Sequence, residues 1–224
     1  MRQRLMVALD VNGRDEALAM REQLGDSVEW LKVGLRLFVA EGPQLIQQLQ
    51  ETHRIFLDLK FHDIPNTVAQ AVTSAGDLGV NMVNVHAGGG AAMLEAAAEA
   101  AKVFPGMQLI AVTVLTSDIM PMDTAQKLAL ERAQMAQAAG LDGVVCSVHE
   151  VAAIKAACSN DFIMVTPGIR WGDQDIQDQK RVADPATAIR AGADHIVVGR
   201  PILHAADPRA AAEQAISMME NAHA

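Results

Sequence analysis

The chain has 224 residues and a formal net charge of −9, and half of its residues are hydrophobic. This length suits one large domain with a sizeable core. The negative charge argues against a nucleic-acid-binding protein, which usually presents a basic patch, and no apolar run reaches the roughly 18 residues of a membrane-spanning helix. The two cysteines, Cys146 and Cys158, lack a CxxC spacing, so we expect a protein of the reducing cytoplasm.

Short segments rich in Val, Ile and Leu alternate along the chain with longer Ala-rich segments. The predicted strands are residues 4–10, 28–34, 54–60, 81–87, 108–116, 143–147, 162–168 and 195–200. The predicted helices include residues 14–25, 66–79, 91–104, 125–140 and 208–222. Strands that are apolar on both faces are typical of a parallel sheet covered by helices. Eight such units in a chain of this length predict a single-domain (β/α)8 TIM barrel over residues 1–224, with a doubly wound open sheet as the alternative.

Polar side chains stand at the C-terminal ends of most predicted strands. They are Asp10, Lys32, Asp58, Lys60, His86, Thr116 and Arg200. In a barrel these strand ends meet at one mouth, where active sites are built. A charge at one strand end is often only the first solvated residue of a loop, but the shared position of so many predicts a site.

The stretch IFLDLKFHDIPNTV, residues 55–68, concentrates this charge. Asp58 and Lys60 are two residues apart on a strand and therefore share a face, and Lys32 lies near the C-terminal end of the preceding predicted strand. Asp63 lies just before Pro65, where a carboxylate could instead cap the next helix or favour its dipole. A lysine held between carboxylates stays charged, so it is a poor nucleophile and a good placed cation. The array suits a reaction that develops a carbanion and then protonates it.

Two later stretches resemble anion sites. Residues 166–181 follow the seventh predicted strand and residues 197–202 follow the eighth, and these are the loops with which barrels commonly bind phosphate. Gly199 would allow a close backbone approach, and Arg170 and Arg200 could pair with phosphate oxygens. The polar segment 171–181 is either a lid that orders on a ligand or a solvated loop.

Motifs for common cofactors and metals are missing from the sequence. No GxGxxG follows a predicted strand, there is no Walker loop, and the seven histidines show no HExxH spacing. We therefore predict neither a cofactor nor a metal site.

The quoted stretch closely resembles the signature of the orotidine 5′-phosphate decarboxylase family. The resemblance continues in LKVGLRLF at 31–38, VNVHAGGG at 83–90, TPGIR at 166–170 and VVGRPI at 197–202. It implies a TIM barrel that converts orotidine 5′-monophosphate to UMP and CO2 in pyrimidine biosynthesis. It also implies that no cofactor or metal is used, and that the enzyme is a homodimer.

The resemblance also implies roles for individual positions. Lys60 is implied as the proton donor to C6 of the pyrimidine, and Lys32, Asp58 and Asp63 as the other members of an alternating Lys-Asp-Lys-Asp network. The positions implied in substrate binding are Asp10, Lys32, Thr67, Thr116, Ser117, Arg170, Gln179, Gly199 and Arg200. Of these, Arg170, Gly199 and Arg200 would hold the phosphate, and Gln179 would bridge base and phosphate. Asp63 and Thr67 would reach the neighbouring subunit's site.

Two alternatives remain at this stage. One is a metal-dependent decarboxylase or aldolase on the same scaffold that acts on a phosphorylated keto-sugar, which would need a further carboxylate ligand. The other is a non-catalytic barrel that binds a phosphorylated ligand.

Overall fold

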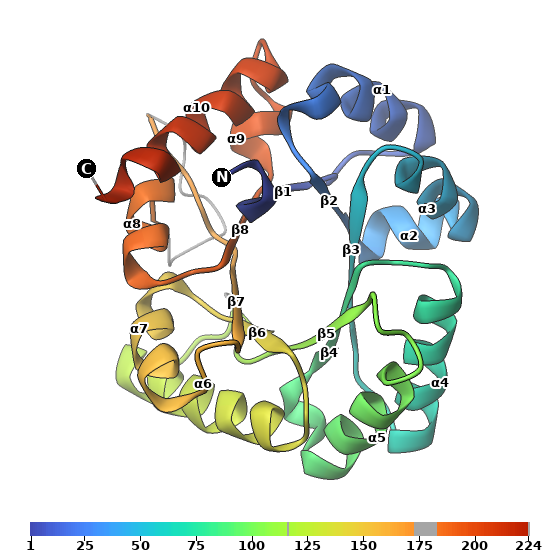
Figure 1. Cartoon of the computed structure of the whole chain (residues 1–224), viewed down its shortest axis with the longest axis vertical. Helices are drawn as coiled ribbons and strands as arrows, with labels where there is room; N and C mark the ends of the chain where they lie inside the picture. Colours follow the sequence, from blue (N-terminus) through green and yellow to red (C-terminus); the bar gives the residue numbers. More distant parts are fainter. Residues whose placement is uncertain (116, 173–182, 224) are drawn as a thin grey trace.

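The computed structural model describes residues 1–115, 117–172 and 183–223. Eight parallel strands form a closed barrel in which neighbours in sequence pair with one another and the first strand pairs with the last (Figure 1). The strands are β1 (Leu5–Ala8), β2 (Trp30–Gly34), β3 (Arg54–Phe61), β4 (Met82–His86), β5 (Gln108–Val112), β6 (Gly143–Val145), β7 (Ile163–Thr166) and β8 (His195–Val198). The predicted TIM barrel is confirmed, and the open sheet is excluded.

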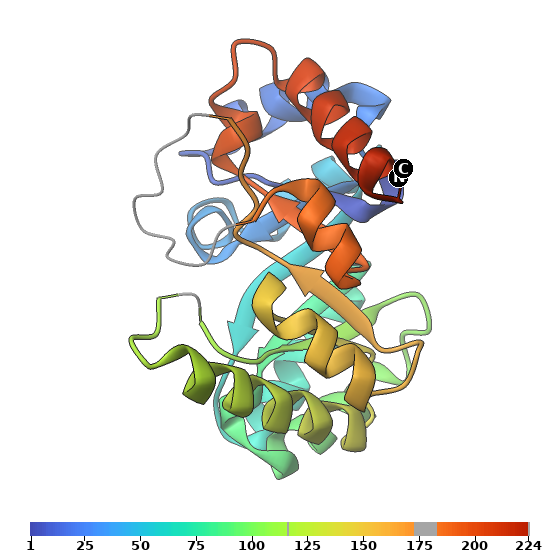
Figure 2. The same ribbon diagram turned by 90° about the vertical axis from the view of Figure 1, so that its left-hand side faces the viewer.

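Helices surround the barrel on its outside (Figure 1). They are α1 (Arg14–Leu24), α2 (Leu35–Glu41), α3 (Pro43–Gln50), α4 (Pro65–Asp77), α5 (Ala91–Ala101), α6 (Met122–Ala138), α7 (Val148–Ala157), α8 (Pro185–Ala191), α9 (Arg200–Leu203) and α10 (Pro208–Glu220). From the side, α10 in red and α6 in yellow-green lie on opposite sides of the strands (Figure 2). Within the described ranges, none of these helices has the length and apolar character needed to cross a bilayer.

The fifth predicted strand, residues 108–116, is too long. The observed strand β5 ends at Val112, although the Thr113 amide still donates to the Val145 carbonyl oxygen at 3.1 Å. Val114 and Leu115 extend the apolar run because they line a cavity. Strand periodicity alone does not distinguish apolar residues that line a cavity from residues that continue a strand.

Two separate apolar layers hold the barrel. The larger layer packs the outer faces of the strands against the helices. The smaller layer fills the barrel interior and consists of Met6, Ala8, Trp30, Phe56, Met82, Ile110, Val165 and Val197. Because strand side chains alternate between faces, the next inward residue after each of these lies one layer nearer the C-terminal mouth.

The N-terminal end of the barrel interior is closed by an aromatic group. The Trp30 ring packs edge-on against the His195 ring, with centroids 5.7 Å apart, and the Arg54 guanidinium lies 4.2 Å from the Trp30 ring centroid. Burial lowers the pKa of His195 from 6.5 to about 4, although Asp194 acts in the opposite direction. The folded protein therefore keeps this imidazole neutral at pH values where the unfolded chain protonates it.

This difference predicts that His195 makes the free energy of unfolding depend on pH. The unfolded chain binds the proton as pH falls below about 6.5 and the folded chain only near 4, so stability decreases with falling pH between these values, by up to about 3 kcal/mol. Urea unfolding of the wild type and His195→Gln at pH 7 and pH 4 measures it. The wild type should lose more stability than the variant, and equal losses would contradict the assignment.

Candidate functional site

A cavity of about 430 Å³ opens at the C-terminal mouth of the barrel. Its apolar wall includes Phe56, Val112, Val114, Leu115 and Val145. The predicted site residues that line it are Asp10, Lys32, Asp58, Lys60, Arg170, Gly199 and Arg200. The structure thus gathers into one cavity side chains that lie up to 190 residues apart in sequence, with charged groups beside an apolar surface that suits a flat ring.

The barrel's own geometry explains this gathering. Asp10, Lys32 and Asp58 each come two residues after an inward residue of the apolar interior, namely Ala8, Trp30 and Phe56. Each therefore also points inward, one layer nearer the mouth. The large Trp30 and Phe56 side chains are buried below, so the charged layer forms the floor of the cavity.

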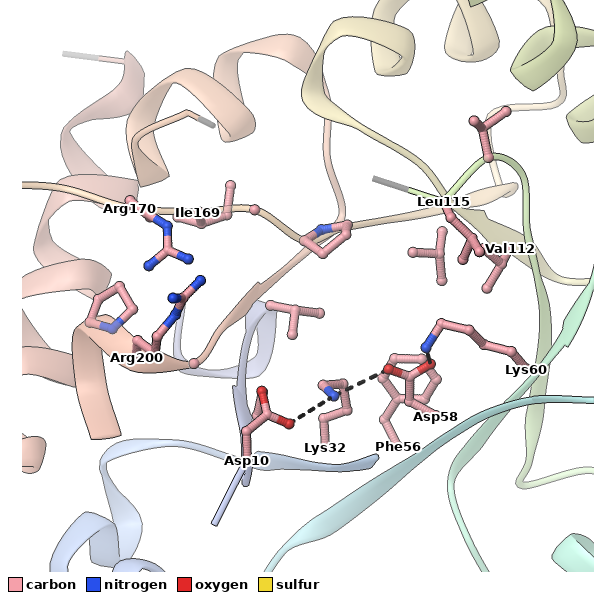
Figure 3. Close-up of a pocket in the computed structure, with 18 of the residues that line it drawn as sticks. Asp10, Lys32, Phe56, Asp58, Lys60, Val112, Leu115, Ile169, Arg170 and Arg200 are labelled. Atoms are coloured by element: carbon pink, nitrogen blue, oxygen red, sulfur yellow. Dashed lines mark hydrogen bonds and ion pairs between the residues drawn. The ribbon is translucent and has the colours of Figure 1, made fainter. Parts of the chain in front are cut away.

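The charged groups form a continuous chain of ion pairs (Figure 3). Lys32 Nζ lies 3.7 Å from Asp10 Oδ1 and 3.2 Å from Asp58 Oδ2. Lys60 Nζ donates to the other oxygen, Asp58 Oδ1, at 2.6 Å. The side chains of Lys32 and Asp58 are only 10% and 14% exposed, whereas that of Lys60 is 38% exposed. Asp58 therefore fixes two ammonium groups, of which Lys60 is the one more open to the cavity.

Asp58 stays ionised despite its burial. Burial acts to raise its pKa, but Lys32 and Lys60, together with hydrogen bonds from Lys60 and Asn84, outweigh burial and hold the pKa below its usual value. A carboxylate in this setting keeps its negative charge at neutral pH, and its two oxygens orient the neighbouring cations.

The backbone at Lys60 departs from regular strand geometry. Lys60 has φ 53°, and it is the one non-glycine with positive φ in the described part of the chain. The pairing of β3 with β4 shifts at this point, because Leu57 is opposite Val83 while Phe61 is opposite Val85. Asp58 and Lys60 do face the same cavity, but an irregular backbone rather than simple alternation places Lys60 there.

Asn84 is a site residue that the sequence reasoning missed. It is fully buried, its Oδ1 accepts a hydrogen bond from the Lys60 amide at 2.8 Å, and its Nδ2 donates to Asp58 Oδ1 at 2.7 Å. A signal was present, because a polar residue two positions after Met82 in an apolar strand predicts an inward side chain next to Asp58.

The opposite end of the cavity carries two arginines. In Figure 3 the guanidinium groups of Arg170, in the loop after β7, and Arg200, the first residue of α9, approach each other across the cavity from Lys60. Gly168, with φ 79°, makes the turn out of β7 in a conformation that residues with a Cβ rarely adopt. Two converging guanidinium groups suit a dianionic phosphate.

Other predicted site residues lie away from this cavity. Asp63 and Thr67 are exposed at the start of α4, and the one hydrogen bond that the described residues give Asp63 joins its Oδ1 to the Ile64 amide at 2.7 Å. Ser117 is exposed. Thr116, Gln179 and most of the predicted lid lie outside the described residues.

His86 also lies outside the cavity. Its ring stacks on His62, with centroids 5.1 Å apart and planes 5° from parallel. Burial, followed by Arg132, lowers its pKa. Among the described residues, no three His, Cys, Asp or Glu side chains are grouped so that they could hold a metal ion.

Comparison with known proteins assigns the family. The sequence profile of the "Orotidine 5′-phosphate decarboxylase / HUMPS family" matches residues 3–215. The orotidine 5′-phosphate decarboxylase of Halorhodospira halophila is 51% identical over 218 residues, covering 93% of this chain and 92% of that protein. That of Legionella pneumophila strain Lens is 49% identical over 215 residues, covering 92% and 94%.

A solved structure agrees with these sequence matches. The crystal structure of orotidine 5′-phosphate decarboxylase from Lactobacillus acidophilus superposes with a TM-score of 0.83 at 36% identity, covering 97% of this chain and 99% of that one. Sequence, fold and cavity together show that the chain belongs to the orotidine 5′-phosphate decarboxylase family.

Proposed function

We propose that this family member, with residues 1–224 forming one catalytic domain, decarboxylates orotidine 5′-monophosphate to UMP by means of Lys60. The observation that carries the proposal is the 2.6 Å contact between Lys60 Nζ and Asp58 Oδ1, in a cavity whose other end holds two arginines. The phosphate would lie at Arg170, Gly199 and Arg200, and the pyrimidine against the apolar wall with C6 beside Lys60.

The chemistry follows from that placement. The bond between C6 and the carboxyl carbon breaks, CO2 leaves, and the electron pair remains on C6. The fixed Lys60 ammonium stabilises this developing charge, and preorganised electrostatics of that kind is usually the largest catalytic contribution. Lys60 then transfers a proton to C6, which gives UMP, and regains a proton from water. Asp58 would lie beside the substrate carboxylate, and Asp10 and Lys32 beside the ribose.

We further propose that the active unit is a homodimer with shared sites. Asp63 and Thr67 would then complete the neighbouring site and add the second carboxylate of a Lys-Asp-Lys-Asp network. Exposed apolar side chains near the mouth support an interface there, since Leu35 is 59% and Ile64 is 65% exposed. Asp63 is exposed, and no ion pair found among the described residues joins it to a lysine of its own chain, which is consistent with this role.

A direct assay tests the activity. Purified protein is incubated with orotidine 5′-monophosphate and EDTA, and the loss of orotate absorbance is followed. Steady turnover is expected, and no turnover would overturn the proposal. Turnover that stops with EDTA and returns with a divalent metal would favour the metal-dependent alternative.

The arginine pair gives a separate prediction. Arg200→Ala should weaken UMP binding and lower kcat/KM, because a charge-paired contact to phosphate is lost. The loss of binding free energy should be roughly 2–5 kcal/mol. Arg190→Ala is the matched control, since Arg190 is exposed on α8 and bonds to Thr187 Oγ1. The nucleoside orotidine should be much less sensitive to Arg200→Ala. Equal losses for nucleotide and nucleoside would show that Arg200 does not bind phosphate.

A further inference from the structure

Asn84 occupies the gap that opens between β3 and β4. The residues on either side of it pair normally, Val83 with Leu57 and Val85 with Phe61. Three residues of β3, Asp58 to Lys60, therefore lie opposite the single residue Asn84. A strand that bulges in this way leaves backbone groups without ladder partners.

The Asn84 side chain replaces the missing ladder partner. Its Oδ1 accepts from the Lys60 amide at 2.8 Å, and this amide belongs to the residue with the left-handed backbone. Its Nδ2 donates to Asp58 Oδ1 at 2.7 Å, the same oxygen that accepts from Lys60 Nζ at 2.6 Å. One fully buried amide thus contacts both the backbone of Lys60 and the ion-pair partner of its ammonium group.

We propose that Asn84 is a positioning residue that sets the Lys60 ammonium for proton transfer, by holding the Lys60 backbone in its left-handed conformation and orienting the Asp58 carboxylate. The inference rests on the proposed role of Lys60. A left-handed backbone is unfavourable at a lysine, so it needs a specific partner. The bond from the Lys60 amide needs an acceptor and the bond to Asp58 needs a donor. An amide side chain supplies both, whereas an ionised carboxylate supplies only acceptors.

The first experiment removes both bonds with Asn84→Ala. Because a small misplacement of a reacting group reduces turnover strongly, we expect kcat to fall about 100-fold. The KM for orotidine 5′-monophosphate and the affinity for UMP should change by no more than about threefold, since the arginine pair is untouched.

The matched control is Asn81→Ala. Asn81 Oδ1 accepts from the Ile55 amide at 2.9 Å, so it makes the same type of bond to the same strand, at the end far from the cavity. Its kcat should stay close to that of the wild type. A kcat loss in Asn81→Ala equal to that in Asn84→Ala would show that any weakened β3 contact suffices, and would overturn the inference.

The second experiment uses Asn84→Asp and a pH profile. When protonated, the new carboxyl group has the shape and hydrogen-bonding pattern of the amide: its O–H donates to Asp58 and its C=O accepts from the Lys60 amide. When ionised, it repels Asp58 and displaces it. The ratio of variant to wild-type kcat should therefore be highest at low pH and fall at least about tenfold as pH rises. Asn84→Ala should show no such pH-dependent ratio.

Two further results would overturn the proposal. One is a ratio for Asn84→Asp that does not change with pH, and the other is a loss in Asn84→Ala that appears in KM and UMP affinity rather than in kcat. If circular dichroism shows that Asn84→Ala does not fold, the near-isosteric Asn84→Asp variant is used as the only test. Lys60→Ala is assayed in parallel. Near-normal turnover of Lys60→Ala would contradict the proposed function itself. An inactive Lys60→Ala together with Asn84 variants of normal activity would contradict only this inference.

Discussion

Lys60→Ala is expected to lower kcat by at least about four powers of ten. In the proposed mechanism the substitution removes a fixed cation beside the developing carbanion, which is worth about 10²–10³, and a positioned proton donor, which is worth about 10²–10⁴. UMP binding should be affected far less, because Arg170 and Arg200, which we propose bind the phosphate, lie at the other end of the cavity. Single-turnover decarboxylation and UMP titration of the variant measure the two quantities separately.

The experiment must also check that the Lys60→Ala variant is folded. Lys60 is one of two cations on Asp58, and removing a partner from a buried charge destabilises a protein. Lys155→Ala is a matched control, because Lys155 Nζ forms a comparable 2.8 Å ion pair with Asp194 at the opposite end of the barrel. A folded Lys60→Ala protein with near-wild-type turnover would remove Lys60 from the mechanism, whatever its distance from Asp58.

The barrel and most of its site were predictable because both depend on strand periodicity. Apolar runs separated by helical segments indicate parallel strands, and in a closed barrel all of their C-terminal ends meet. Asp10, Lys32 and Asp58 could therefore be grouped without any knowledge of distances. The two arginines followed from the same rule, since Arg200 ends the eighth predicted strand and Arg170 lies two residues after the seventh.

The irregular geometry around Lys60 was not predictable in the same way. Periodicity treats Asp58 and Lys60 as ordinary alternate residues, whereas the chain bulges between them and β4 and gives Lys60 a left-handed backbone. A lysine is a poor indicator of positive φ, because that conformation favours glycine. The conformation depends on tertiary contacts with Asn84, which lies on another strand 24 residues later.

The structure of a single chain does not decide between two roles for Asp63. Its position just before α4 fits either a helix-end carboxylate or a residue that reaches a neighbouring site. Among the described residues of its own chain, its one hydrogen bond is the one it accepts from the Ile64 amide. The second reading depends on a partner subunit, so it stays a prediction that needs its own experiment.

We predict that two nearly inactive variants, Lys60→Ala and Asp63→Ala, restore each other's activity when they form mixed dimers. In a mixed dimer with shared sites, one site collects both substitutions and the other collects neither. Random pairing of equal amounts makes about half of the dimers mixed under two-fold symmetry, and each has one intact site of two. About a quarter of wild-type activity should therefore return when the variants are unfolded and refolded together.

A second mixture distinguishes shared sites from any general effect of mixing. Asp58 and Lys60 of one chain lie 2.6 Å apart and belong to the same site, so every site in a mixed dimer of Asp58→Ala and Lys60→Ala carries one of the two defects. That mixture should stay as inactive as its components. If Lys60→Ala with Asp63→Ala behaves in the same way, despite heterodimers confirmed by mass spectrometry, then Asp63 serves the site of its own chain. Recovery in the first mixture alone requires that Asp63 of the partner subunit enters the cavity that holds Lys60, because no other arrangement leaves an intact site.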